Sequence, residues 1–408
     1  MKTIARRCGL NFLVLLSSVS TCVPALLAQT NPPPFDPREM VTRQPHTLTR
    51  QSDRSAALDL LDRARQNFNL YDIKTPYTLK ASFETSGTAQ YEGDWTMEEY
   101  SDGGSHWRWS AQLRDLKVTR IGVDDRVYGN NASEPIPLRV QLVRSALHSP
   151  FARHAGGMAI RAADVDRDGK EMDCLLLSGA IPPNPAPRSW YESEYCIDHA
   201  NALLRMWSEA PGIYAVYDYT GATPFHGHTL PRQITIFEDG NLVVQARVES
   251  LEDKVNLDAN LFKPAPDMEN AEESFTLASP NRLPMRVDPS DAPTSTYFQP
   301  VIIHAILDAQ DGTVLDAESL QNSDHDLSRQ AIDLVKSTSF PASGFQQEVF
   351  INVQFHFPAA RYGGPPMFHT PVRWVILDHH GPPLRRKPRS GPRAIAEPSA
   401  RTPATLPD

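Results

Sequence analysis

The chain has 408 residues, of which 40% are hydrophobic and 22% charged, and its formal net charge is -9. This acidic excess argues against a general nucleic-acid binder, because such a protein needs concentrated basic surface to neutralise phosphates. The length suggests two domains with irregular ends, and the 36 prolines, which cluster at the ends and junctions, indicate linkers.

The N-terminus has the pattern of a secretory signal peptide. Basic residues within Lys2–Arg7 precede an apolar run at Leu10–Val19, and Ala25–Ala28 supplies small residues for a cleavage site. We therefore predict a cleaved signal peptide at residues 1–28 and a mature protein in the periplasm or outer cell envelope. A short membrane anchor and a lipid-anchored form cleaved before Cys22 are the alternatives. The apolar run is shorter than the roughly 20 residues of a spanning helix, which favours cleavage.

The cysteines divide into two groups. Cys8 and Cys22 belong to the signal region, which leaves Cys174 and Cys196 in the mature protein. In an exported chain, two cysteines predict a disulfide rather than a metal pair, which would need two further ligands. Two unpaired buried thiols are the alternative.

A linker and a helix open the mature chain. Residues 29–52 are polar and proline-rich, as is typical of a linker. Apolar residues at helical spacing then predict a helix from Asp53 to Leu70, with Ser52/Asp53 as its N-terminal cap. The apolar face of this helix consists of Leu58, Leu61, Ala64 and Phe68.

After this helix, apolar residues recur at every second position, which indicates strands. Strands alternating in this way, separated by glycine-containing turns, predict an antiparallel meander with one apolar face. A helix from Pro137 to Leu147 interrupts the sheet, and residues 238–241 form a hairpin turn. We place this domain at residues 53–265 and expect a curved antiparallel half-barrel with helices.

A second proline-rich linker, at residues 266–297, precedes a compact unit at residues 298–357. The unit has the order strand, strand, helix, strand. Residues 358–408 are rich in Pro, Gly and Arg and are predicted to form a disordered tail. The fold class is therefore α+β. The elements of the compact unit are expected at Val301–Leu307, Val314–Gln321, Asp324–Ser337 and Gln347–Phe357.

The unit at 298–357 resembles the C-terminal domain of the TonB energy-transducer family. The resemblance rests on its first two strands with the Asp311-Gly312 turn between them, its helix, the Phe340-Pro341-Ala342 segment and the closing strand. It covers about a sixth of the chain. The resemblance implies a small β-β-α-β domain and, for a full member of the family, a role in transport through outer-membrane receptors.

The sequence departs from the TonB family at two points. Only Tyr297–Pro300 stands where the family usually has a tyrosine-proline pair and a short helix. A working transducer also keeps an uncleaved N-terminal membrane helix, whereas this chain is predicted to lose its own. We therefore expect the fold of the family rather than energy transduction, and a TonB-type transport component is the alternative.

The domain at 53–265 resembles the LolA-like group of periplasmic lipoprotein carriers. The resemblance rests on the N-terminal helix, the long meander with tryptophans, and the segments Leu230–Ile234 and Asp258–Phe262. It implies a half-barrel over helices with an apolar concave face, and a lipid or lipoprotein ligand.

Two patterns are typical of metal sites, but neither is complete. Asp164–Gly169 opens like a calcium loop, yet Leu175 stands where a bidentate acid should close it. His226 and His228 could offer two imidazoles to zinc, whereas catalytic zinc usually takes three protein ligands. A hairpin turn and a loop with exposed histidines are favoured, so we predict no metal and no cofactor.

No catalytic motif stands out in the sequence. Glu98 and Glu99 are adjacent on a predicted strand and point to opposite faces, so they cannot flank one glycosidic bond. A serine-hydrolase elbow, a zinc-protease pair, a phosphate loop and a dinucleotide fingerprint are all missing. We therefore expect a binding protein rather than an enzyme.

Aromatic residues on one face of the meander are the candidate ligand contacts. On the concave face of a half-barrel they could line a pocket for acyl chains or another apolar ligand. The alternative is that they fill the core against the first helix. The candidates are Tyr77, Phe83, Trp95, Trp107 and Trp109.

The closing strand at Gln347–Phe357 is the candidate site for a protein partner. An exposed sheet edge can bind an extended segment by strand addition, and the expected partner is another envelope protein, including an outer-membrane receptor. The basic tail is expected either to contact anionic lipid or to keep the protein in solution. The residues of the predicted edge are Val349, Ile351, Val353 and Phe355.

Overall fold

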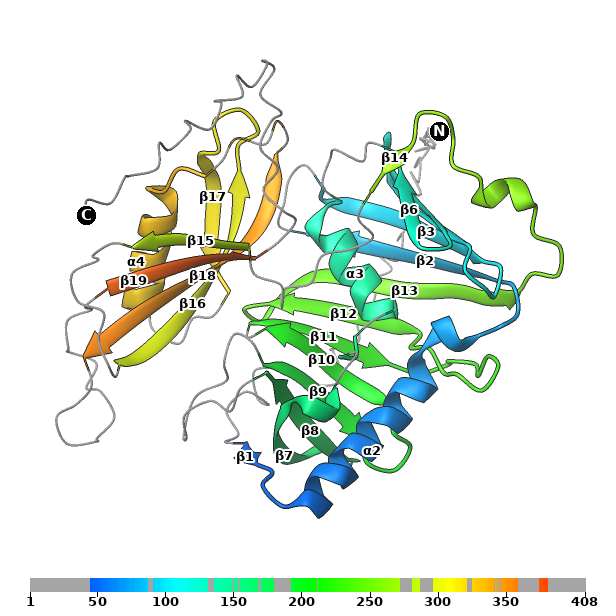
Figure 1. The fold of residues 1–408 in the computed structure, drawn as a ribbon, viewed down its shortest axis with the longest axis horizontal. Coiled ribbons are helices and arrows are strands. Elements are labelled where there is room, and N and C mark those ends of the chain that lie inside the picture. Colours follow the sequence, from blue (N-terminus) through cyan, green and yellow to red (C-terminus); the bar gives the residue numbers. More distant parts are fainter. Residues whose placement is uncertain are drawn as a thin grey trace, which may run out of the picture. The chain divides into compact units, whose positions relative to one another are not determined.

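The computed structural model describes most of residues 45–380 (Figure 1). The predicted signal peptide, most of the first linker and the end of the tail lie outside the described residues. Within the described part, none of the helices has both the length and the apolar character needed to cross a membrane. The residues outside the description are 1–44, 87–90, 131–135, 149, 153–154, 168–169, 180–191, 211, 272–280, 287–295, 321–324, 341, 343, 345, 359–373 and 381–408.

One antiparallel sheet of 14 strands forms the first domain (Figure 1). The sheet is open, because its two end strands do not pair with each other. This confirms the large antiparallel sheet that the alternating pattern predicted. In spatial order the strands are β1 (His46–Thr47), β7 (Ala159–Arg167), β8 (Lys170–Ser178), β9 (Ser193–Asp198), β10 (Leu204–Ala210), β11 (Ile213–Asp218), β12 (Gln233–Glu238), β13 (Asn241–Asp253), β2 (Tyr77–Thr85), β3 (Gly93–Ser101), β4 (Trp107–Leu113), β5 (Leu116–Val123), β6 (Arg126–Gly129) and β14 (Glu269–Asn270).

Strands β12 and β13 show how local sequence sets the register. They are joined by the two-residue turn Asp239-Gly240, as predicted. Both residues have positive φ, 47° and 74°, which a type I′ hairpin turn requires and which asparagine, aspartate and glycine tolerate best. The turn therefore places β13 directly beside β12, and β13 in turn pairs with β2.

Two helices, α2 (Gln51–Phe68) and α3 (Leu138–His148), lie on the same face of the large sheet (Figure 1). Helix α2 buries one face through Ala57, Leu60, Leu61, Ala64 and Phe68, which confirms its amphipathic pattern. The predicted Ser52/Asp53 cap is wrong, because Arg50 occupies the N-cap position and makes no side-chain cap. Helix α3 is buried at 10 of its 11 positions, so its charged residues need buried partners.

The second sheet has five strands and one helix, α4 (His325–Lys336). Strands β16 and β17, helix α4 and strand β18 follow one another in the predicted order. Strands β15 and β19 lie in the segments predicted to be linker and tail, so those two predictions are wrong at these strands. Both segments are proline-rich on average, so their composition did not predict the short strands within them. These strands form by pairing with strands that are distant in the sequence. In spatial order the strands are β15 (Asn281–Arg286), β19 (Trp374–His380), β18 (Gln347–Pro358), β16 (Thr296–Leu307) and β17 (Val314–Ser319).

Strand β18 is not an edge strand, which corrects the predicted partner site. It pairs with β16 on one side and with β19 on the other, so its backbone groups are used on both sides. Its apolar side chains pack with residues of α4 such as Leu327 and Ala331. Strand addition at β18 is therefore blocked by β19. The predicted edge residues, all fully buried in this small core, are Val349, Ile351, Val353 and Phe355.

The predicted disulfide is confirmed. Cys174 on β8 and Cys196 on β9 face each other across the two strands, and their Sγ atoms are 2.10 Å apart. Their side chains lie in a small apolar cluster with Met172, Met206 and Phe237. This cluster is separate from the main core, and the disulfide links the two neighbouring strands within it.

Candidate ligand-binding site

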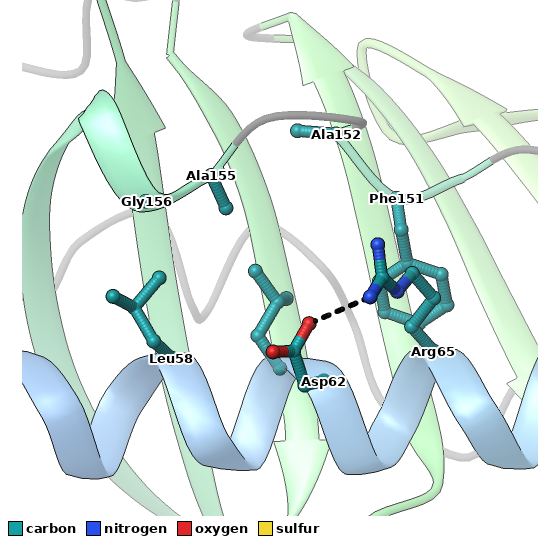
Figure 2. Close-up of a pocket in the computed structure, with 8 residues that line it drawn as sticks. Leu58, Asp62, Arg65, Phe151, Ala152, Ala155 and Gly156 are labelled. Atoms are coloured by element: carbon teal, nitrogen blue, oxygen red, sulfur yellow. Dashed lines mark ion pairs between the residues drawn. The ribbon is translucent and has the colours of Figure 1, made fainter.

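A cavity of about 250 Å³ lies between α2 and the segment that follows α3 (Figure 2). The α2 residues that line it are spaced by three and four positions, so they share one side of the helix. The opposite wall comes from Phe151, Ala152, Ala155 and Gly156, of which the last two belong to a short 3-10 turn (Ala155–Gly157). The lining residues are Leu58, Leu61, Asp62, Arg65, Phe151, Ala152, Ala155 and Gly156.

Aromatic rings hold the far wall of the cavity in place. Phe151 stacks on Tyr195 of β9, with ring centroids 5.7 Å apart, and meets Phe68 of α2 edge to face at 5.9 Å. Phe68 in turn packs edge to face on Tyr217 of β11 at 5.6 Å. Aromatic pairs of this kind each contribute about 0.5–1.5 kcal/mol beyond their buried area. The wall is therefore anchored to both the helix and the sheet.

Hydrogen bonds tie the same wall to its surroundings. The backbone N–H of Ala152 donates to the Tyr195 hydroxyl at 3.0 Å. Burial raises the pKa of Tyr195, so this hydroxyl stays neutral. At the other end, Arg54 of α2 donates to the carbonyl of Met158 at 3.0 Å. The cavity is thus bounded by positioned groups on both sides.

The rim of the cavity is charged. Asp62 and Arg65 form an ion pair at 3.0 Å, and their side chains are 58% and 44% exposed (Figure 2). An exposed pair of this kind contributes at most about 1 kcal/mol, so little is lost when either partner turns towards another group. Apolar and aromatic walls below an exposed ion pair suit an amphiphile, with its apolar part inside and its polar part at the rim.

The predicted aromatic set lies elsewhere. Tyr77, Phe83, Trp95 and Trp109 share one face of β2, β3 and β4, as predicted, and are only 0–3% exposed. Phe83 stacks on Trp95 across two strands with ring centroids 5.7 Å apart. Trp107 is half-buried beneath Arg144, whose guanidinium carbon lies 5.4 Å from its ring centroid. None of the five lines the cavity, and the four buried ones belong to the packed core.

A buried charged network joins α3 to this aromatic face. Glu99 of β3 accepts a hydrogen bond from Arg144, and its Oε2 lies 3.0 Å from His148 Nε2. Arg144 also lies over the Trp109 ring at 4.7 Å. Glu98, the adjacent residue, faces the other side of the strand and pairs with Lys80 at 3.1 Å. The two glutamates therefore point to opposite faces, as predicted, and cannot act on one bond.

The network controls the ionisation of Glu99. Burial alone would raise its pKa, but the charges of His148 and Arg144 and their hydrogen bonds outweigh burial and lower the pKa to about 2. Glu99 thus remains a carboxylate at neutral pH. Burial, followed by the nearby charge of Glu99, raises the pKa of Tyr77, so that phenol remains neutral.

We expect this network to make stability fall in acid. The Glu99 pKa is lower in the folded protein than its ordinary value near 4.5, so its contribution is complete above about pH 4.5 and is lost as the pH falls towards 2. The shift corresponds to about 3 kcal/mol. Urea unfolding between pH 2 and 7 should show a steeper acid loss for the wild type than for Glu99→Gln. Parallel pH profiles would contradict this.

The two histidines of the incomplete zinc pattern have different neighbours in the structure. His226 Nε2 lies 2.6 Å from Asp253, whereas His228 Nδ1 lies 2.8 Å from the carbonyl of Gln66, so the two imidazoles take separate partners. Asp164–Arg167 form the end of β7, and residues 168–169, which precede the start of β8 at Lys170, lie outside the described part of the chain. Strands on both sides fit the predicted hairpin rather than a helix–loop–helix calcium site.

The cavity itself was not predicted from the sequence. The spacing of Leu58 and Leu61 predicted the apolar face of α2 correctly, but it could not tell which part of that face remains uncovered. Residues 151–156 show neither helical nor strand periodicity. The one local signal is a phenylalanine soon after a buried helix, with Ala152, Ala155 and Gly156 near it in the sequence, and this signal is weak.

Comparisons with solved structures found weak similarities. No protein-family model and no curated protein matches the chain. A LolA superfamily protein from Nitrosomonas europaea is 12% identical, with a TM-score of 0.36 over 51% of this chain and 97% of the other. A DUF1329 family protein from Desulfovibrio piger is 11% identical, with a TM-score of 0.35 over 51% and 96%. Pseudomonas aeruginosa MucB, in its complex with MucA, is 13% identical, with a TM-score of 0.28 over 80% and 94%.

At these identities and TM-scores the matches decide neither of the two resemblances seen in the sequence. The resemblance of the first domain to the LolA-like group and that of the second domain to the TonB family both stay predictions.

Proposed function

We propose that this protein is an exported envelope protein that binds an apolar or lipid-like ligand in the cavity beneath α2. The observation that supports this most directly is the cavity itself, with two leucines and a phenylalanine in its walls and an exposed ion pair at its rim. Its walls offer apolar surface, and its lining residues include no serine, cysteine, histidine or lysine. Binding therefore suits the site better than catalysis.

The size of the cavity limits the ligand. A volume of about 250 Å³ lies slightly below the range of about 300–1,000 Å³ that is usual for pockets that bury a drug-sized molecule. One acyl chain or a similar slender apolar group fits this space better than a folded lipid with several chains. The rim places a guanidinium and a carboxylate where the polar end of such a ligand would emerge.

The cellular setting of the proposal rests on the N-terminal sequence. The pattern at residues 1–28 predicts export, and the disulfide agrees with an oxidising compartment such as the periplasm. A protein partner remains part of the proposal, although strand addition at β18 is not. No feature of the described residues specifically supports a TonB-type transport role.

Filling the cavity should weaken ligand binding. Ala155→Phe adds a ring to the wall opposite α2, so we expect the affinity for a fluorescent fatty-acid probe to fall at least tenfold. The matched control is Ala56→Phe, which makes the same change on the exposed face of α2. Fluorescence titration of the purified full chain measures both variants, and circular dichroism confirms that each is folded.

Two outcomes would contradict the proposed site. If the wild type and both variants all bind the probe equally weakly, the protein does not bind a ligand of this class. Probe binding that Ala155→Phe leaves unchanged would place the ligand elsewhere in the protein.

A further inference from the structure

Four ionisable side chains from distant parts of the sequence meet in one cluster, in which only Glu318 is exposed. Arg139 comes from α3, Glu238 from the end of β12, His304 from β16 and Glu318 from β17. His304 Nδ1 lies 3.2 Å from Glu318 Oε1 and 3.5 Å from Glu238 Oε2. The sequence predicts no metal site here, because the three potential ligands are far apart in the chain and show no motif spacing.

The distances in this cluster match the ligand shell of a small metal ion. One ligand atom from each of Glu238, His304 and Glu318 lies within 4.8 Å of the other two. Zinc binds nitrogen and oxygen ligands at about 2.0–2.2 Å, so neighbouring ligand atoms of a tetrahedral site are about 3.3 Å apart. The two distances from His304 Nδ1 lie on either side of that value.

Buried oxygen atoms without partners supply an independent observation. Arg139 donates to Oε2 of Glu238 at 2.9 Å, but Oε1 of the same carboxylate is buried and has no hydrogen-bond partner among the described residues. Glu348 of β18 is 4% exposed, interacts electrostatically with His304 and also lacks a partner for both oxygens. Buried carboxylate oxygens are normally hydrogen-bonded or bound to a metal, because leaving them unpaired costs several kcal/mol.

The formal charges of the cluster do not balance without a cation. Glu238, Glu318 and Glu348 carry three negative charges when ionised, and Arg139 carries one positive charge. A divalent cation would make this group neutral with His304 uncharged, the state in which an imidazole binds metals. With no ion, even a protonated His304 leaves one negative charge in excess.

We propose that Glu238, His304 and Glu318 bind one zinc ion, with a fourth position open to water. An imidazole and two carboxylates form a ligand set that zinc accepts. The Glu318 side chain is 57% exposed, which gives an ion a path from solvent. Bound there, zinc links β12 of the large sheet to β16 and β17 of the small sheet. The site is independent of the cavity beneath α2 and of the function proposed for it.

Zinc titration of the full chain tests the site. The protein is prepared without a polyhistidine tag, dialysed against a chelator and then titrated with zinc chloride by calorimetry. We expect one equivalent to bind. Glu318→Gln, a half-exposed change that keeps the side-chain shape, should weaken binding at least tenfold, and His304→Gln should abolish it. The matched control, His226→Gln, removes an exposed histidine that pairs with Asp253 and should bind zinc like the wild type.

A second readout follows from linkage. An ion that binds only the folded protein raises the ratio of folded to unfolded protein about 100-fold at a concentration 100 times its dissociation constant. Zinc should therefore raise the melting temperature of the wild type and of His226→Gln equally, and raise that of Glu318→Gln clearly less. With a tenfold weaker affinity, the same zinc concentration changes the ratio for Glu318→Gln only about 10-fold. Failure of the wild type to bind zinc would overturn the proposal. So would equal zinc affinity in the wild type and Glu318→Gln, because the ion would then lie elsewhere.

Discussion

Arg144→Ala is expected to lower the free energy of unfolding by about 3–5 kcal/mol, the usual cost of removing one partner from a buried ion pair. Glu99 would remain a carboxylate in the core with only His148 to compensate it. The substitution also removes the guanidinium that lies 4.7 Å from the centre of the Trp109 ring. Urea unfolding followed by circular dichroism measures the loss.

A matched control separates burial from charge. Arg329 of α4 pairs with Asp326 at 2.9 Å, but both side chains are more than two-thirds exposed. Arg329→Ala should therefore cost less than about 1 kcal/mol. Adding Glu99→Gln to Arg144→Ala should restore part of the lost stability, because a neutral amide no longer needs a buried cation. Equal losses in Arg144→Ala and Arg329→Ala would show that the buried network does not hold α3 on the sheet.

The sequence predicted the parts of the fold that depend on local periodicity. The three-to-four spacing of Leu61, Ala64 and Phe68 was enough to identify α2, because those positions share a helix face whatever they pack against. The Asp239-Gly240 turn was equally local. The disulfide between Cys174 and Cys196 followed from counting the cysteines of an exported chain, without knowledge of strand order.

The errors arose where structure depends on pairing between distant segments. β19 forms beside β18 across a gap of proline-rich sequence, and a short strand in such surroundings has no visible pattern until its partner is known. The same is true of the candidate sites. The cavity needs α2 together with Phe151 and the small residues of its opposite wall. The proposed zinc site needs three residues that only the sheet topology brings together.

The tryptophans show a subtler limit. The alternation of apolar residues on β3 and β4 places Trp95 and Trp109 on the apolar face correctly. The same alternation is expected whether that face binds a ligand or is covered by helices. What decides between them is the volume that α3 occupies. In the structure Arg144 of α3 covers Trp107 and Trp109, so the aromatic face is closed by the protein's own side chains.

Trp109→Ala is accordingly expected to act on stability rather than on ligand binding. The side chain is 0% exposed, and removing a fully buried tryptophan typically costs about 3–5 kcal/mol, because the surrounding core only partly closes the space. Urea unfolding should show this loss. The control Leu242→Ala, at a side chain that is 47% exposed, should change stability by no more than about 0.5 kcal/mol.

The same variant decides between the two interpretations of the aromatic face. If Trp109 is a core residue, the folded fraction of Trp109→Ala should bind the fatty-acid probe within about twofold of the wild-type affinity, because Trp109 does not line the cavity. If it contacts the ligand instead, the substitution should cost little stability and most of the probe affinity. That second result would move the binding site from the cavity beneath α2 to the aromatic face of β2–β4, because only a ligand held there would lose its contacts when Trp109 is truncated.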